Sequence, residues 1–404
     1  MKPSDRKIFG TLFFSIFAAV TGVGIVVPLL PVYAHDLGAS GLYIGMVFGA
    51  FSLSRTFFLP YFGRQSDRIG RKPFIVTGLF SYAVVSVAFM IFGGVEALIV
   101  IRFLQGITSA MIMPVVQAYV GDITPKGREG WTMGLFNMSL FIGLSAGPLI
   151  GGVVKDRFSL QGAFLSMGVL SLFGFGLSLA LLPPTREESV VRKGRPPAQW
   201  SIILTDRILA GLFFFRLAYT ACIGIIWGFL PVLADMEFSA SASAIGVLVM
   251  LGISVSGVMH VPMGWLADRL NRKVMVILGG LVAAVAVHAF NFTTGFQGML
   301  WASVVFGIGG GISMPALMAA AVLRGSSSDA MGSVMALLTV AHSLGMLLGS
   351  VFAGVMMDWF ELRQAFVFGS ALMAAGTLWF TVCTWSVDLS RETILAPAPQ
   401  ITDG

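Results

Sequence analysis

Residues 63–73 read Gly-Arg-Gln-Ser-Asp-Arg-Ile-Gly-Arg-Lys-Pro, and residues 264–273 repeat the pattern as Gly-Trp-Leu-Ala-Asp-Arg-Leu-Asn-Arg-Lys. Five identities align at a constant shift of 264 − 63 = 201 residues. Shifts of 200 to 202 residues relate further stretches: Leu30-Pro31-Val32 with Leu230-Pro231-Val232, Met113-Pro114 with Met314-Pro315, and Ala163-Phe164 with Ala365-Phe366. Half of 404 is 202, so the sequence indicates a duplication of one unit.

The repeated unit consists of long apolar segments. Hydrophobic residues make up 56% of the chain and charged residues 11%, and the mean hydropathy is +0.89. A soluble domain of this length needs far more charge on its surface, whereas a bilayer is itself an apolar solvent. Because about 20 apolar residues cross a membrane, we expect twelve spans: 8–34, 42–62, 73–93, 95–120, 130–154, 162–182, 207–233, 244–266, 274–294, 298–323, 330–356 and 364–386.

The expected fold is an all-α integral membrane protein of two six-helix bundles related by pseudo-two-fold symmetry. Six spans is an even number, so both copies enter the membrane from the same side and the repeats are parallel. The expected organisation is an N-terminal bundle (1–182), a cytoplasmic linker (183–206), a C-terminal bundle (207–389) and a disordered cytoplasmic tail (390–404).

The charge distribution predicts an orientation. With both termini in the cytoplasm, nineteen of the 25 Lys and Arg residues fall on the inner side, and only Lys155, Arg157 and Arg363 fall outside. This is the positive-inside pattern of a multi-pass protein of the cytoplasmic (inner) membrane. The net charge of +6 therefore reflects orientation, and we expect no nucleic-acid partner.

Several motifs resemble those of one family. Besides the stretch at 63–73 and its repeat, they are Arg102-x-x-Gln105-Gly106, Gly143-x-x-x-Gly147-Pro148-x-x-Gly151-Gly152, and Gly24-Ile25-x-x-Pro28-x-x-Pro31. Together with the layout of six plus six spans, they resemble the major facilitator superfamily; the span 5 motif resembles the one associated with antiporters, and the last motif is similar to the twelve-span drug/proton antiporter branch. The resemblance implies a secondary transporter that works by alternating access, with spans 1, 4, 7 and 10 around a central cavity.

The repeated loop is a candidate gate. Asp67 lies among basic side chains at the membrane face and can accept charge-assisted hydrogen bonds from Arg68 or Arg71. Asp122, at the inner end of span 4, can share the same cations. The resemblance implies that such contacts hold one conformation until they break; a plain positive-inside loop is the alternative. The predicted gating residues are Gly63, Asp67, Arg68, Arg71, Asp122, Gly264, Asp268, Arg269 and Arg272.

The glycines of span 5 predict close helix packing. Gly143, Gly147 and Gly151 follow at intervals of four, which leaves one helix face nearly bare, and Pro148 and Gly152 lie beside them. Tight packing alone explains this pattern. The resemblance adds a seal against leak in exporters, which would use the same contacts.

Charged residues inside the membrane are functional candidates. The spans contain Arg55, Arg102 and Arg216, and no Asp or Glu lies comparably deep. Arg216 lies about 13 Å from Arg207 along a helix, near the midplane of a core of about 30 Å. An interhelical bond to backbone carbonyls is the preferred interpretation for Arg55. The predicted cavity residues are Arg102, Gln105, Gln117, Arg216, Tyr219, Trp227, Thr21 and Asn137.

Proton coupling requires a titratable group, and the candidates are His260, His342 and the peripheral Asp36. A neutral histidine that only forms hydrogen bonds is the alternative for each. Span 1 lacks the carboxylate common in drug antiporters, so an arginine-lined cavity favours an anionic or amphiphilic substrate over a cationic drug.

The sequence therefore predicts a proton-linked exporter of a small organic solute. An importer or exchanger of organic anions and a lipid flippase remain alternatives. No P-loop, His-Glu-x-x-His or Gly-x-Ser-x-Gly pattern is present, which argues against ATP as the driver and against an enzyme. We expect no cofactor and no metal, membrane lipid and the solute as partners, and a monomer.

Overall fold

The computed structural model describes residues 3–125, 129–183, 205–327 and 331–386. Within these ranges, 12 helices are long and apolar enough to cross a membrane. Their bounds are α1 Pro3–Asp36, α2 Gly41–Ile69, α3 Arg71–Ile91, α4 Val95–Asp122, α5 Glu129–Arg157, α6 Leu160–Leu181, α8 Arg207–Phe238, α9 Ala242–Ala267, α10 Arg272–Ala289, α11 Phe296–Ser327, α12 Met331–Trp359 and α13 Leu362–Cys383. The predicted all-α fold is confirmed, while most of the expected linker and the whole of the expected tail lie outside the described residues.

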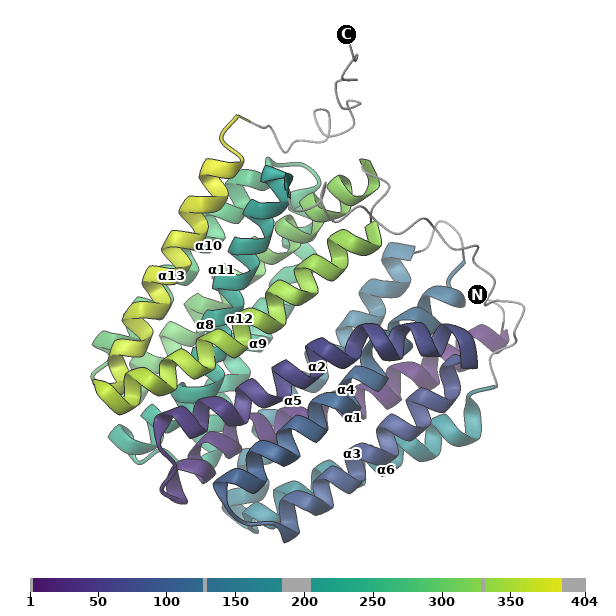
Figure 1. The fold of residues 1–404 in the computed structure, drawn as a ribbon, viewed down its shortest axis with the longest axis horizontal. Coiled ribbons are helices and arrows are strands. Elements are labelled where there is room, and N and C mark those ends of the chain that lie inside the picture. Colours follow the sequence, from purple (N-terminus) through teal and green to yellow (C-terminus); the bar gives the residue numbers. More distant parts are fainter. Residues whose placement is uncertain (1–2, 126–128, 184–204, 328–330, 387–404) are drawn as a thin grey trace.

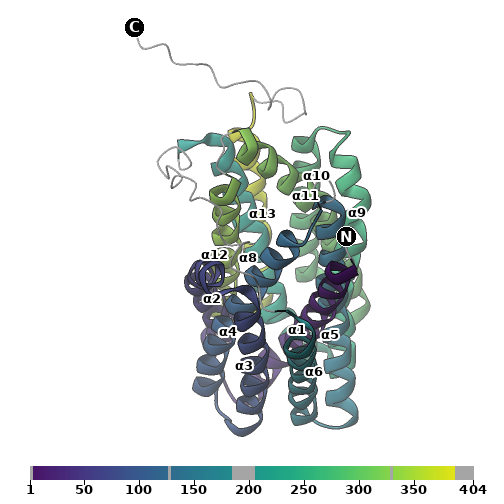
Figure 2. The ribbon, with the colours of Figure 1, turned by 90° about the vertical axis from the view of Figure 1, so that its right-hand side faces the viewer.

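The helices form two groups with matching internal contacts. In the first half, α1 packs against α5 and α6, and α2 packs against α4; in the second half, α8 packs against α12 and α13, and α9 against α11. Each contact recurs between equivalent helices, as a duplication requires. Figures 1 and 2 show the two halves lying side by side.

The bundle has two ends that differ in charge. The basic face is the end at which α1 and α8 begin, and it carries Arg64, Arg68, Arg207, Arg269 and Lys273. The closed face is the opposite end, where α1 and α8 finish at Asp36 and Phe238. Figure 1 shows the ribbons of the two halves diverging from the closed face toward the basic face.

Small residues bring the halves together at the closed face, where α2 packs on α12 and α5 packs on α9. Gly45 lies against the backbone of Ser350, and Gly246 lies against the backbone of Pro148, so neither glycine leaves room for a side chain. Close backbone approach of this kind increases van der Waals contact between helices in a membrane.

Two carboxylates join the halves at the same face. Asp358 of α12 accepts hydrogen bonds from the backbone amides of Gly41 (2.6 Å) and Leu42 (2.8 Å), which begin α2. Asp156 of α5 accepts from Ala242 (3.1 Å) and Ser243 (2.7 Å), which begin α9. These interhalf caps, as we call the two contacts, are related by the repeat, since 358 − 156 = 202. Each satisfies free helix amides and places a negative charge at a helix N-terminus.

The glycine ladder of α5 lies on α1. The backbone of α1 at Phe17, Gly24 and Ile25 occupies the space that side chains would take at Gly143, Gly147 and Gly151. The predicted close packing is therefore present within the first half. α5 remains a continuous helix through Pro148.

Candidate functional site

A cavity of about 510 Å³ lies between the two halves at mid-depth. Its lining comes from both halves and is mainly apolar, with residues such as Val23, Phe141, Ile223, Leu248 and Phe306. The polar lining residues are Ser52, Arg55, Tyr82, Arg102, Ser109, Asn137, Arg216, Tyr219, Trp227, Ser256, His260, Ser303 and His342. The volume and the few convergent polar groups suit a drug-sized ligand. Among the described residues that line the cavity, none is Asp or Glu.

Arg102 is held by groups of its own half. Its Nε donates to the carbonyl oxygen of Val47 (3.2 Å), and its terminal nitrogen donates to Oε1 of Gln105 (2.7 Å). The guanidinium also lies over the rings of Phe48 and Phe51, at 5.1 and 4.5 Å from their centroids. With 2% of its surface exposed, Arg102 is a buried and well-partnered cation at the cavity wall.

Arg216 of α8 is bonded to weaker acceptors. One terminal nitrogen donates to the sulfur of Met314 (2.7 Å), and the other lies 3.3 Å from Nδ1 of His342. A thioether is a weak acceptor, and a neutral imidazole offers one lone pair. The Nε of Arg216 is buried and has no hydrogen-bond partner.

Arg55 of α2 also lines the cavity, and its buried Nε has no hydrogen-bond partner. Tyr82 on α3 and His342 on α12 line the same cavity. The sequence favoured hydrogen bonds from Arg55 to backbone carbonyls. Its Nε forms no such bond in the structure. The sequence marked Arg55 as a functional candidate because it is a charged residue inside a predicted membrane span.

The remaining predicted cavity residues divide into two groups. Tyr219, Trp227 and Asn137 line the cavity. Thr21 donates to the carbonyl of Phe17 in its own helix, and the exposed Gln117 is not a lining residue. Gln105 is fully buried, but it contacts Arg102 and not the cavity.

The two span histidines differ in their contacts. His260 lies on the wall with Nδ1 2.6 Å from the carbonyl oxygen of Ser256, and its ring is 4.7 Å from that of Phe141. A carbonyl is only an acceptor, so Nδ1 of His260 carries a proton. His342 also lines the cavity, beside Arg216.

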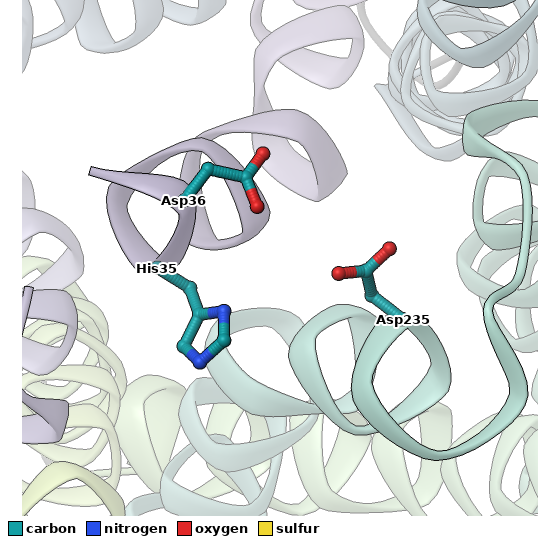
Figure 3. Close-up of side chains that lie close together, drawn as sticks. All are labelled: His35, Asp36 and Asp235. Carbon is teal, nitrogen blue, oxygen red and sulfur yellow. The ribbon is translucent and has the colours of Figure 1, made fainter. Parts of the chain in front are cut away.

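Asp36 lies away from the cavity, at the closed face. It forms a cluster with His35 of α1 and Asp235 of α8, whose nitrogen and oxygen ligand atoms all lie within 4.8 Å of one another. Figure 3 shows the carboxylates of Asp36 and Asp235 directed into the same space, with the His35 ring beside it. Imidazole and carboxylate are groups that bind protons or divalent cations, and here they come from both halves.

The predicted gating residues lie at the basic face, and the ion pairs that they form with one another each join residues of the same half. Arg71 pairs with Asp67 (2.6 Å) and Asp122 (3.3 Å), as expected from the sequence. The repeat places Arg272 3.7 Å from Asp268. Arg68 is exposed, and Arg269 lies over the ring of Trp265. A side chain at Gly63 would meet open space, and one at Gly264 would make only an ordinary contact with Pro315.

Membrane-crossing helices in two like halves around a shared cavity define a polytopic membrane transporter. The family comparison agrees: a profile of the Major Facilitator Superfamily matches residues 12–259 and 212–393. The chain belongs to this superfamily.

Named relatives support the drug/proton antiporter branch. Multidrug resistance protein 2 of Bacillus subtilis is 25% identical over 386 residues, which cover 92% of this chain and 94% of that protein. Quinolone resistance protein NorA of Staphylococcus aureus is 30% identical over 220 residues, or 53% of this chain and 56% of NorA. A bacterial homolog of the human lysosomal transporter Spinster, solved in an inward-facing and unoccupied conformation, shares the fold with a TM-score of 0.76. It is 16% identical, and the match covers 95% of this chain and 96% of that one.

Proposed function

We propose that this transporter is a proton-linked exporter of amphiphilic organic anions across the cytoplasmic membrane. The observation that carries the proposal is the mainly apolar cavity with arginines from both halves and no carboxylate among its described lining residues. Arginine pairs with carboxylates and phosphates through charge-assisted hydrogen bonds. Apolar walls bind the rest of such a molecule.

The orientation follows from charge. Basic loops lie on the cytoplasmic side of membrane proteins, so the basic face is cytoplasmic in this proposal. The interhalf caps then close the outer side, and the cavity belongs to an inward-facing state that receives solute from the cytoplasm. Rocking of the two halves about the cavity would expose it to the outside.

Export is supported by the relatives, since two of them are named for multidrug and quinolone resistance. The cavity itself argues for a different charge preference from that of a cation exporter. A lipophilic cation would meet Arg55, Arg102 and Arg216 with no opposite charge to offset them. We therefore infer anions as the substrate class within an efflux lineage.

Proton coupling has three candidate groups in this proposal. His260 and His342 line the cavity, and Asp36 lies at the closed face beside His35 and Asp235. A histidine in a ligand cavity can exchange a proton during the cycle. The functional unit is proposed to be the monomer, because one chain contributes the whole described cavity.

Transport by purified protein in liposomes tests the proposal. Decyl phosphate, decyltrimethylammonium and decanol share one chain length and differ in charge, and each is followed with an isotope label under an imposed pH gradient. We expect the anion alone to be moved against its gradient, with loss of movement when a protonophore is added. Movement of the cation alone would contradict the substrate class, and anion movement that ignores the protonophore would favour an exchanger.

A further inference from the structure

We propose that the acidic group of the substrate binds between Arg55 and Arg216, beside His342, and so bridges the two halves. Arg102 is excluded as its primary partner. This subsite rests on the proposed function and deepens it, because it assigns which of three arginines recognises the anion.

Unpartnered nitrogens mark the subsite. The Nε atoms of Arg55 and Arg216 are both buried without a hydrogen-bond partner, and both side chains line the same cavity. Buried polar groups in native proteins are usually hydrogen-bonded, so such atoms point to a missing acceptor. A carboxylate or phosphate supplies several acceptor oxygens at once.

One neighbour connects the two arginines. His342 on α12 lies 3.3 Å from Arg216, and both residues line the cavity together with Arg55. Arg55 belongs to α2 of the first half, whereas Arg216 and His342 belong to the second half. An anion near His342 is therefore within the electrostatic reach of cations from both halves.

Arg102 is more fully engaged by its own half than the other two arginines. Its guanidinium already donates to Val47 and Gln105 and lies over two phenylalanine rings. The Nε donor and one terminal N–H donor are therefore already used, and the two rings cover part of the guanidinium. Arg102 therefore acts as a fixed positive charge in the wall.

The bridging position has a consequence for the transport cycle. Without a ligand, closing the cytoplasmic side would bring two uncompensated cations of opposite halves into a drier environment, where their repulsion is stronger. An anion between them converts this repulsion into two attractions. A ligand shifts a conformational equilibrium only when it binds one state more tightly than the other. An anion between the two arginines binds the state with a closed cytoplasmic side more tightly than the open state, whereas a cation does not.

Binding to a set of charge-neutralised variants tests the subsite. The protein is placed in phosphatidylcholine nanodiscs, and affinities for decyl phosphate, decanoate and decanol are measured by calorimetry. We expect R55Q and R216Q each to weaken both anions at least tenfold while decanol binds unchanged. R55K and R216K are matched controls that keep the charge and should retain most of the affinity.

The variant R102Q separates the subsite from a general effect of positive charge. We expect it to lower thermal stability and to weaken the anions by less than R55Q does. If R102Q abolishes anion binding while R55Q and R216Q bind as tightly as wild type, the assigned subsite is wrong. If wild type binds decyltrimethylammonium and neither anion, the proposed substrate class fails together with the subsite.

Retained decanol binding shows that a variant has kept its cavity, so a lost anion signal is not mistaken for misfolding. Phosphatidic acid added to the nanodiscs distinguishes a lipid headgroup from a free solute. Competition by this lipid against decyl phosphate supports the same subsite with a lipid as occupant. Its failure to compete supports a soluble amphiphile.

Discussion

The closed face and the central cavity differ in how fully the charged side chains are hydrogen-bonded. At the closed face, the carboxylates of Asp156 and Asp358 are each satisfied by two backbone amides of the opposite half. In the cavity, Arg55 and Arg216 each retain a buried Nε without a partner. Satisfied charge joins the halves where they pack, and unsatisfied charge remains where a ligand can bind.

This contrast also separates two roles for intramembrane and interfacial charge. A carboxylate on a helix N-terminus stabilises one conformation whether or not a solute is present. An uncompensated cation in a cavity stabilises a conformation only when its anion arrives.

The largest effect is expected from a wedge at the closed face. Gly45→Val places a side chain where the backbone of Ser350 lies, and Gly246→Val does the same against Pro148. The two halves can then no longer pack at this face, so transport should fall at least tenfold. Gly176→Val is the matched control, because Gly176 has free space around it. Normal transport by both wedge variants would show that the closed-face packing is dispensable.

A smaller shift is expected from the interhalf caps. Replacing a helix-capping side chain with alanine costs about 1 kcal/mol, so Asp156→Ala with Asp358→Ala should destabilise the closed face by about 2 kcal/mol. That equals roughly a thirtyfold change in the population ratio. Labelling of a cysteine introduced at Leu42 by a membrane-impermeant maleimide should accelerate accordingly. An unchanged labelling rate would show that the interhalf caps do not stabilise the closed face.

The basic face should respond in the opposite direction. If Asp67 helps to hold the cytoplasmic side closed, as the resemblance implies, Asp67→Asn weakens that state and labelling at the closed face slows. The effect should be small, below about 1 kcal/mol, because the Asp67 side chain is 57% exposed and exposed ion pairs contribute little. Faster labelling would contradict the gating hypothesis.

The smallest effect on binding is expected from Asp36. Asp36→Asn removes a titratable group of the closed-face cluster, which lies outside the cavity. Anion affinity should stay within twofold of wild type, while the dependence of transport on the pH gradient declines. His342→Gln, which alters the cavity, should instead change the affinity. Loss of anion binding in Asp36→Asn would contradict the separation between the two regions.

Much of the fold could be predicted from the sequence because the repeat and the apolar segments are local signals. The expected span 42–62 lies within α2, and the expected span 95–120 lies within α4. The interhalf caps were missed, although Asp156 and Asp358 end equivalent helices in the two repeats. Their acceptor role depends on which helix begins beside them, and that requires the tertiary fold.

The site was less predictable for the same reason. Arg102 is satisfied by groups around Val47 and Phe51, about fifty residues earlier in the chain. Depth along one helix says nothing about such partners. Gln117 fell outside the cavity because, at 3.6 residues per turn, it is rotated by about 60° from Arg102; Ser109 and Met113, which keep the same direction to within about 20°, line it.

The central claim is that an anion, by bridging the halves, allows the cytoplasmic side to close. Double electron–electron resonance tests it with spin labels at Phe92→Cys and Phe292→Cys, exposed positions near the closed face, one in each half. Cys222 and Cys383, the free cysteines, are first replaced by serine. We predict one short distance without ligand, a second and longer distance with decyl phosphate, and no response to decyltrimethylammonium or in R216Q. A longer distance produced by the cation, with none produced by the anion, would contradict the account.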